Sequence, residues 1–282
     1  MPYGIRTLLP ALAVCFAPTA ATADDIADGS VASRWIAGAE AQIRLVSGAD
    51  AQGRPHIGLS FRLREGWKIF WRSPGAPGLP PQLDWRGSQN LKSARLLWPA
   101  PQQFTSFGYR ARGYGGRVTL PIRIVAGDAA KPVDARLFVR YQVCKDVCIP
   151  GEARLRLTLP VATRPHAAVT AALARVPRPA AGDFPVWQVR LDTRRLGARH
   201  LVITLRHRNR VFAKPVVILE PLRRLRLGRT GSVRRQGDGS LSVAIPILGG
   251  KPVPAPLRAR VTVLDGVMAW EKTVAVSGAL TR

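Results

Sequence analysis

Two cysteines four positions apart are the residues of this chain whose type and spacing best suit chemistry. Cys144 and Cys148 lie in the segment Tyr141–Pro150, far from the third cysteine, Cys15. Two thiols this close can form a disulfide, exchange it with another thiol, or hold a soft ion such as Cu(I). Apolar alternation predicts a strand before Cys144 and another soon after Cys148. A short hairpin would hold the two Cα atoms within the ~4.4–6.8 Å that a disulfide needs.

A redox role for this pair competes with a structural one. A ring of five residues adds only about 2 kcal/mol of stability in the chain-entropy model, whereas a domain of this size has about 5–15 kcal/mol. Short and exposed bridges are also the more easily reduced ones. The spacing therefore favours redox exchange, with a structural staple as the alternative. Lys145 favours a thiolate and Asp146 opposes it, so the sequence does not rank the two cysteines as nucleophile.

Metal binding and hydrolysis find less support in the sequence. The four histidines show no ligand spacing near the cysteine pair, and a zinc site would lack ligands; they are His56, His166, His200 and His207. No serine-hydrolase elbow, zinc-protease or phosphate-loop motif occurs in the sequence. We therefore expect no metal and no organic cofactor. Copper handling by the cysteine pair is kept as a further hypothesis.

The N-terminus indicates export. Residues 1–23 have the pattern of a signal peptide, with Arg6, an apolar run over Leu8–Ala17, and the small residues Ala21 and Ala23 at the cleavage site. The run is too short for a membrane helix, and Cys15 would be removed with it. We therefore expect a mature protein in the periplasm, where disulfides persist.

The chain is strongly basic, with 43 Lys and Arg against 17 Asp and Glu and a formal charge of +26. Its basic residues are scattered and no nucleic-acid-binding motif occurs, so we expect no nucleic-acid partner. The charge favours contact with an anionic membrane surface or an acidic partner. The alternative is compositional bias spread over a solvated surface.

Hydrophobic alternation predicts an all-β protein of two β-sandwich domains in tandem. The domain boundaries that we expect are residues 24–162 for the sandwich that carries the cysteines, 163–185 for a linker with a short helix near Ala167–Arg175, and 186–282 for the second sandwich. The predicted strands are 40–47, 56–63, 67–71, 94–98, 117–125, 133–143, 154–160, 186–192, 200–206, 215–220, 232–236, 240–247, 257–264 and 267–276.

Two segments are predicted to be loops. Pro74–Pro81 is too rich in proline for a ladder. Trp98–Tyr109 carries aromatic side chains where a solvent loop is normally polar, which indicates that they cover something. The alternative is that they pack against the edge of their own domain.

Several segments resemble the N-terminal periplasmic domain of the thiol:disulfide interchange protein DsbD family. They are Gly116–Ile124, Ala135–Cys144 and Cys148–Pro150. Gly66–Gly75 and Leu97–Pro101 resemble in particular the ScsB type, a copper-tolerance member. The resemblance covers most of residues 35–160 and implies immunoglobulin-like sandwiches.

The resemblance also implies a function. It implies an exported thiol–disulfide exchange protein, a component of a protein-disulfide reductase, that takes electrons from a membrane-embedded transporter and reduces periplasmic thioredoxin-like proteins. Cys144 and Cys148 would be the catalytic pair. Phe104, Phe107 and Tyr109 would form a cap that shields them. The alternative is an immunoglobulin-like binding module with a structural disulfide.

Overall fold

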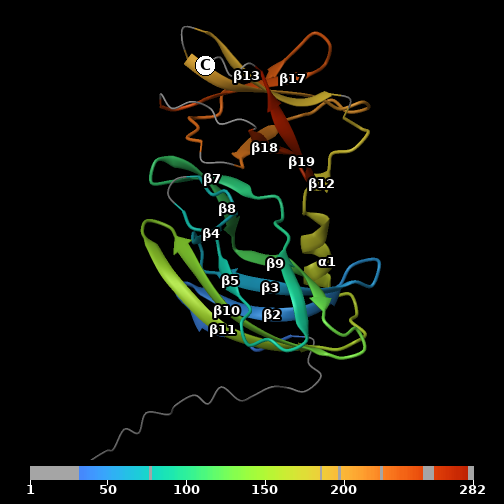
Figure 1. Cartoon of the computed structure of the whole chain (residues 1–282). Coiled ribbons are helices and arrows are strands. Elements are labelled where there is room, and N and C mark those ends of the chain that lie inside the picture. The colour runs from blue at the N-terminus through green and yellow to red at the C-terminus, as the bar shows by residue number, and fades with distance from the viewer. Residues whose placement is uncertain are drawn as a thin grey trace, which may run out of the picture.

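The structure is a computed structural model that describes residues 32–75, 78–184, 186–195, 198–222, 225–249 and 257–278. The predicted signal peptide, residues 1–23, and Cys15 lie outside the described residues. The described chain folds into two β-sheet units that follow one another in sequence and lie end to end (Figure 1). No helix among the described residues is long and apolar enough to cross a membrane.

The first unit packs two antiparallel sheets face to face. One sheet has the strand order β1-β2-β3-β9-β6, and the other has the order β11-β10-β4-β8-β7 with β5 beside β10. Their strands are β1 (Ile36–Gly38), β2 (Ala41–Ala49), β3 (Pro55–Leu63), β4 (Lys68–Phe70), β5 (Gln82–Asp84), β6 (Leu91–Leu96), β7 (Gln102–Ser106), β8 (Tyr109–Gly115), β9 (Arg117–Ala126), β10 (Val133–Cys144) and β11 (Cys148–Leu159).

Strand alternation builds the core between these sheets. Along β10 the side chains of Leu137, Val139, Tyr141 and Val143 are buried, as predicted, because successive residues of a strand face opposite sides. On β11 the leucines at 155, 157 and 159 are buried while the intervening side chains are exposed. The strand begins at Cys148, six residues earlier than predicted. Pro150 is tolerated there because β11 is an edge strand.

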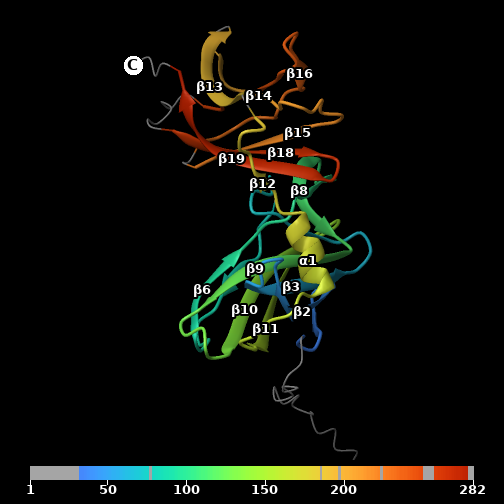
Figure 2. The same cartoon turned by 90° about the vertical axis from the view of Figure 1, so that its right-hand side faces the viewer.

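The short helix expected near residues 167–175 is α1 (Ala167–Ala174), which begins after His166. The Nδ1 atom of His166 accepts a hydrogen bond from the Ala168 amide at 3.2 Å and so caps the helix. The helix lies against the outer face of the first sheet (Figure 2). Val169 is fully buried there, over Gly48 and Gly58; a Cβ atom on either glycine would come within 3 Å of Val169 side-chain atoms.

The second unit has one continuous set of strands in the order β15-β18-β19-β13-β14-β17-β16, with β12 beside β19. Strand β19 pairs with β18 over most of its length and with β13 at its end, so it joins the two layers. The strands are β12 (Arg178–Pro179), β13 (Val186–Arg195), β14 (Ala198–Arg206), β15 (Val216–Pro221), β16 (Arg234–Arg235), β17 (Leu241–Pro246), β18 (Arg258–Asp265) and β19 (Met268–Ser277).

A partly buried ion cluster joins the two units. Arg72, just after β4, is bonded through its guanidinium to Glu220 of β15 (Nη2 to Oε1, 2.7 Å) and to Glu271 of β19. The Arg72 side chain is only 15% exposed, and it also donates to the Thr262 hydroxyl. Ile218, Leu264 and Ala269 of the second unit extend the apolar core of the first. The second unit therefore contacts the first at the end of β4.

Candidate functional site

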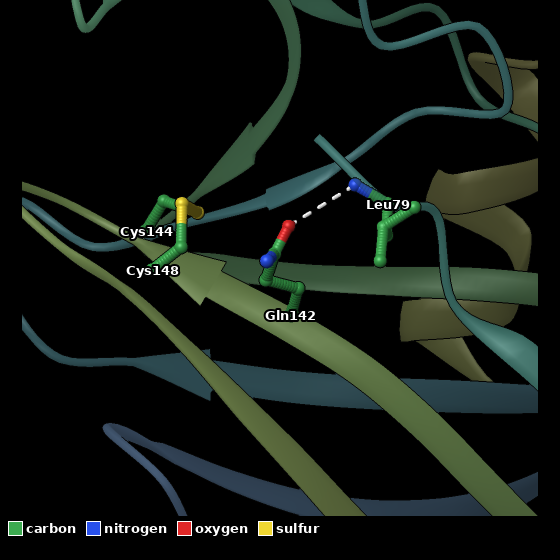
Figure 3. The surroundings of a disulfide bond; sticks show 4 residues. All are labelled: Leu79, Gln142, Cys144 and Cys148. Atoms are coloured by element: carbon green, nitrogen blue, oxygen red, sulfur yellow. Dashed lines mark hydrogen bonds between the residues drawn. A yellow bond between two sulfur atoms is a disulfide. The ribbon is translucent and has the colours of Figure 1, made fainter. Parts of the chain in front are cut away.

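The β10–β11 hairpin closes on the two cysteines. Cys144 and Cys148 are cross-strand partners at the end of an uninterrupted antiparallel register that starts at Val133 and Leu159. Their sulfur atoms are bonded, and their Cα atoms lie 4.2 Å apart (Figure 3). Lys145 to Val147 make the turn, in which the Lys145 amide donates to the Val147 carbonyl at 3.0 Å. The ladder brings the two sulfur atoms together, so the bond closes a loop that the hairpin already closes.

The disulfide rests on a small apolar cluster separate from the main core. Its buried members are Phe70, Ala111 and Cys144, with Phe104 and Cys148 partly buried against them. The two sulfur-bearing residues differ in burial: Cys144 is 2% exposed, whereas Cys148 is half-buried. One side of the bond is therefore closed by protein, and Cys148 is its more accessible end.

Strand β4 brings this cluster together because it pairs with two neighbours. Lys68 lies opposite both Cys144 of β10 and Gly115 of β8, and Phe70 lies opposite Gly113. Gly113 has to be glycine, because a Cβ atom there would lie 2.0 Å from the Ile69 carbonyl oxygen. The close approach of β8 to β4 places Ala111 and Phe70 in one cluster beneath the disulfide.

The predicted aromatic loop is in large part a β-hairpin, which corrects the loop assignment. Strands β7 and β8 pair from Gln102 to Ser106, and Phe107 and Gly108 make a two-residue turn with φ of 49° and 76°. Positive φ at both turn residues is the geometry that matches strand twist. The hairpin extends toward β18 of the second unit (Figure 1).

The three predicted cap residues lie differently on this hairpin. Phe104 packs against the disulfide cluster, with its ring centroid 6.1 Å from that of Phe70. Phe107 and Tyr109 are 47% and 60% exposed and are not part of that cluster. The structure thus brings Phe104 to the cysteine pair and leaves the other two aromatics at the hairpin tip. The shielding role of all three stays a prediction.

Two lysines lie on the segments next to the pair. The Lys68 ammonium lies 6.0 Å from the centre of the Phe104 ring and donates to the Gly66 carbonyl at 3.0 Å. The Lys145 side chain lies beside Gly66 as well. Positive charge near a cysteine favours its thiolate, whereas the carboxylate of Asp146 in the turn opposes it. Figure 3 shows that Gln142, on the same strand as Cys144, accepts a hydrogen bond from the Leu79 amide at 3.2 Å.

No group of three or more His, Cys, Asp or Glu side chains able to hold a metal ion occurs among the described residues. Of the histidines, His56 is fully buried, and its Nδ1 atom donates to the Arg54 carbonyl at 2.9 Å. His207 packs among the aromatic rings of the second unit. Among the described residues, the histidines therefore form no metal-binding group with the two cysteines.

Comparison with known proteins identifies the first unit. Residues 33–160 match the family described as thiol:disulfide interchange protein DsbD, N-terminal. Residues 33–160 belong to the DsbD N-terminal family. This DsbD N-terminal domain contains the whole disulfide cluster, namely Phe70, Phe104, Ala111, Cys144 and Cys148. The predicted family is therefore confirmed. A search among curated proteins found no match.

A solved structure extends the likeness beyond the DsbD N-terminal domain. The crystal structure of the N-terminal periplasmic domain of ScsB from Proteus mirabilis matches with a TM-score of 0.69 and 22% sequence identity. The match covers 89% of this chain and all of that one. At this identity the likeness concerns the fold, and its coverage includes both units. The predicted all-β fold, with two tandem immunoglobulin-like sandwiches, is confirmed.

Sequence reasoning missed part of the site. Phe70 and Ala111, which pack against the disulfide, are not among the predicted site residues, and neither is Lys68. A signal for Phe70 existed in the alternation of Trp67 to Trp71. Residues 69 and 71 go to the main core, which leaves 68 and 70 for the other face. The residues that share this face with Phe70 follow only from the pairing of β4 with β8 and β10, which the sequence pattern does not give.

We predict that Phe104→Ala speeds reduction of the disulfide by dithiothreitol several-fold, because it removes the ring that packs beside the bond. The matched control is Phe107→Ala, which removes the same ring from an exposed position on the same hairpin and should leave the rate unchanged. The fraction of chain with an intact disulfide can be followed over time by alkylation of the released thiols and mass spectrometry. Equal rates for the two variants and the wild type would show that Phe104 does not shield the bond.

Proposed function

We propose that this chain is an exported thiol–disulfide exchange protein of the periplasm, whose Cys144–Cys148 pair is the redox centre. In this proposal a membrane-embedded electron transporter reduces the disulfide, and the resulting dithiol reduces disulfides of periplasmic thioredoxin-like proteins. One observation carries the proposal. A disulfide lies at the tip of a hairpin inside a DsbD N-terminal domain; its Cys148 end is accessible, and its Cys144 end packs against apolar side chains.

The hairpin geometry argues against a purely structural bond. Twelve consecutive residue pairs already hold β10 to β11, and the disulfide joins the last of them. A cross-link stabilises mainly by restricting the unfolded chain, and the effect is smallest for short loops, about 2 kcal/mol for five residues. A bond that adds so little to the fold, at an accessible position, is better suited to being broken and remade.

The exchange follows from ordinary thiol chemistry. A thiolate of the reduced pair attacks the disulfide of the thioredoxin-like protein, forms a mixed disulfide and releases one thiolate of that protein. The second cysteine then attacks the mixed disulfide, which closes the Cys144–Cys148 bond and releases the other thiolate. Two electrons pass to the thioredoxin-like protein, and its two thiolates take up protons. The membrane transporter restores the dithiol by supplying two electrons.

The difference in burial supports different parts for the two cysteines in this exchange. Cys148 is half-buried and Cys144 is 2% exposed, so we propose that Cys148 forms the mixed disulfide and Cys144 resolves it. Lys68 lies opposite Cys144 and Lys145 follows it in the chain; both charges favour the attacking thiolate, whereas Asp146 opposes it. No cofactor takes part in these steps.

The reduction potential of the pair tests the proposal against a structural staple. We expect a potential between about −120 and −270 mV, the range of relay proteins, whereas structural disulfides lie below about −300 mV. Equilibration with thioredoxin-like proteins of known potential, read out by alkylation of free thiols, measures both the value and the exchange itself. A potential below about −300 mV, in the range of structural disulfides, together with no thiol–disulfide exchange with these proteins, would contradict the proposed function.

A further inference from the structure

A second feature, separate from the disulfide cluster, is a basic concavity on the outer face of the first sheet. Its volume is about 340 Å³, and its lining residues come from α1, strands β2, β3 and β9 and the neighbouring segments. None of the residues of the disulfide cluster lines this concavity. Its polar lining is formed by four arginines, one tryptophan and two hydroxyl residues, which are Arg44, Arg62, Arg117, Arg175, Trp35, Ser60 and Thr119.

The register of the sheet places these groups side by side. Arg62 lies opposite Arg117 across the β3–β9 pair, and Ser60 lies opposite Thr119 one pleat further. The two hydroxyl oxygens are 2.8 Å apart. Arg44 lies opposite Ser60 across the β2–β3 pair. The alternate residues on these strands go to the core, so the strand period of two directs all five polar side chains to the outer face.

An aromatic ring holds two of the arginines in place. The guanidinium carbons of Arg44 and Arg62 lie 4.6 and 4.1 Å from the centre of the Trp35 ring. Stacking on an indole face is a favourable position for a guanidinium and leaves its N–H groups free to donate. Arg175, at the end of α1, is fixed by a hydrogen bond to the Ala100 carbonyl.

The positive charge of this concavity is not compensated within the described chain. Among the described residues, none of the four guanidiniums forms an ion pair with a carboxylate. The Nε atom of Arg44 is buried without a hydrogen-bond partner. Burial and the neighbouring charge of Arg62 lower the pKa of Arg44. A buried donor without a partner is costly, and an anion bound by these guanidiniums would offset their mutual repulsion.

We propose that this concavity is a binding site for a phosphate-bearing anion. Guanidinium forks match the oxygen atoms of phosphate, and several arginines around one concavity suit a group with several charged oxygens. The volume is at the lower end of the range for small-molecule sites, larger than a bare ion needs. The phosphate group belongs to a soluble phosphoester or to the headgroup of an anionic lipid; the recognition chemistry is the same.

Calorimetric titration of the mature chain with pyrophosphate, in about 0.15 M salt to screen diffuse attraction, tests this proposal. We expect saturable binding. The double variant Arg62→Gln/Arg117→Gln should weaken it by about tenfold or more for each guanidinium removed, since these are charge-assisted bonds. Both side chains are exposed, so the fold should persist, and disulfide reduction by dithiothreitol should be unchanged. The control is Arg95→Gln/Arg140→Gln, which removes the same charge from exposed positions outside the concavity.

Sedimentation with lipid vesicles distinguishes the two sources of phosphate. Binding to vesicles that contain phosphatidylglycerol but not to pure phosphatidylcholine, lost in Arg62→Gln/Arg117→Gln and competed by pyrophosphate, assigns the site to a lipid headgroup. Pyrophosphate binding without vesicle binding assigns it to a soluble phosphoester. The proposal is overturned if neither probe binds saturably, or if the control variant weakens binding as much as the site variant.

Discussion

Cys144→Ser is expected to yield a protein that captures a thioredoxin-like partner as a mixed disulfide but cannot release it in reduced form. Cys148 remains, and it is the more accessible of the two sulfur-bearing residues. Its thiolate can attack the disulfide of the partner, but no second thiolate is present to resolve the product. Net reduction of the partner should therefore fall to the rate measured without protein. After alkylation of the thiol released from the partner, a non-reducing gel should show the covalent complex.

Cys148→Ser is the matched variant for this experiment. It retains Cys144, which is 2% exposed and packed against Phe70 and Ala111. Because the attacking sulfur has to reach the partner, capture should be much slower than in Cys144→Ser, while net reduction is lost in both. Exchange at the wild-type rate in both variants would refute a redox role for the pair. Equal rates of capture would refute the assignment of Cys148 as the sulfur that attacks the partner's disulfide.

Arg72→Leu is expected to uncouple the two sandwiches. The substitution removes the cation that Glu220 and Glu271 share and leaves two carboxylates that are only 12% and 24% exposed. Breaking a buried ion pair by removing one partner costs about 3–5 kcal/mol; Glu271 retains Arg260 at 3.6 Å, so we expect about 3 kcal/mol. Calorimetry should show a lower first transition and a separation of the unfolding of the two units.

Two further variants interpret the result for Arg72. Arg86→Leu breaks an ion pair with Asp84 whose arginine is 91% exposed, and such surface pairs contribute little to stability because solvent screens them. It should leave the transitions in place. The triple variant Arg72→Leu/Glu220→Leu/Glu271→Leu removes Arg72 and both of its carboxylates at once and should recover part of the loss, because no carboxylate stays unpaired and the remaining Arg260 is 33% exposed. Unchanged unfolding of Arg72→Leu would show that the cluster does not hold the sandwiches together.

Much of the fold could be predicted from local patterns. The alternation of β10 and β11 fixes which side chains enter the core, and it also places Cys144 and Cys148 at a hairpin end. The β7–β8 hairpin could not be predicted in this way. Its turn is made by Phe107 and Gly108, and a bulky residue at positive φ is not a turn signal in a sequence.

The parts of the site that escaped prediction depend on contacts between distant residues. Phe70 meets the disulfide only because β4 pairs with both β8 and β10. Arg72 bonds carboxylates 148 and 199 positions further along the chain. The basic concavity needs three strands in register and a helix laid beside them. Periodicity gives the face on which a side chain lies, but the partners on that face follow from the order of strands in the sheet.

The connection between the sandwiches has a mechanical consequence. Helix α1 is pinned along the first sandwich by Val169, and its end is held by paired hydrogen bonds between Ala100 and Arg175. The second sandwich is therefore joined through a segment that the first sandwich holds in place, on the side toward which the β7–β8 hairpin extends (Figure 1). We expect that a redox protein approaching the sulfur atoms from this side has to fit beside the second sandwich, so that its shape as well as its chemistry decides whether it can react.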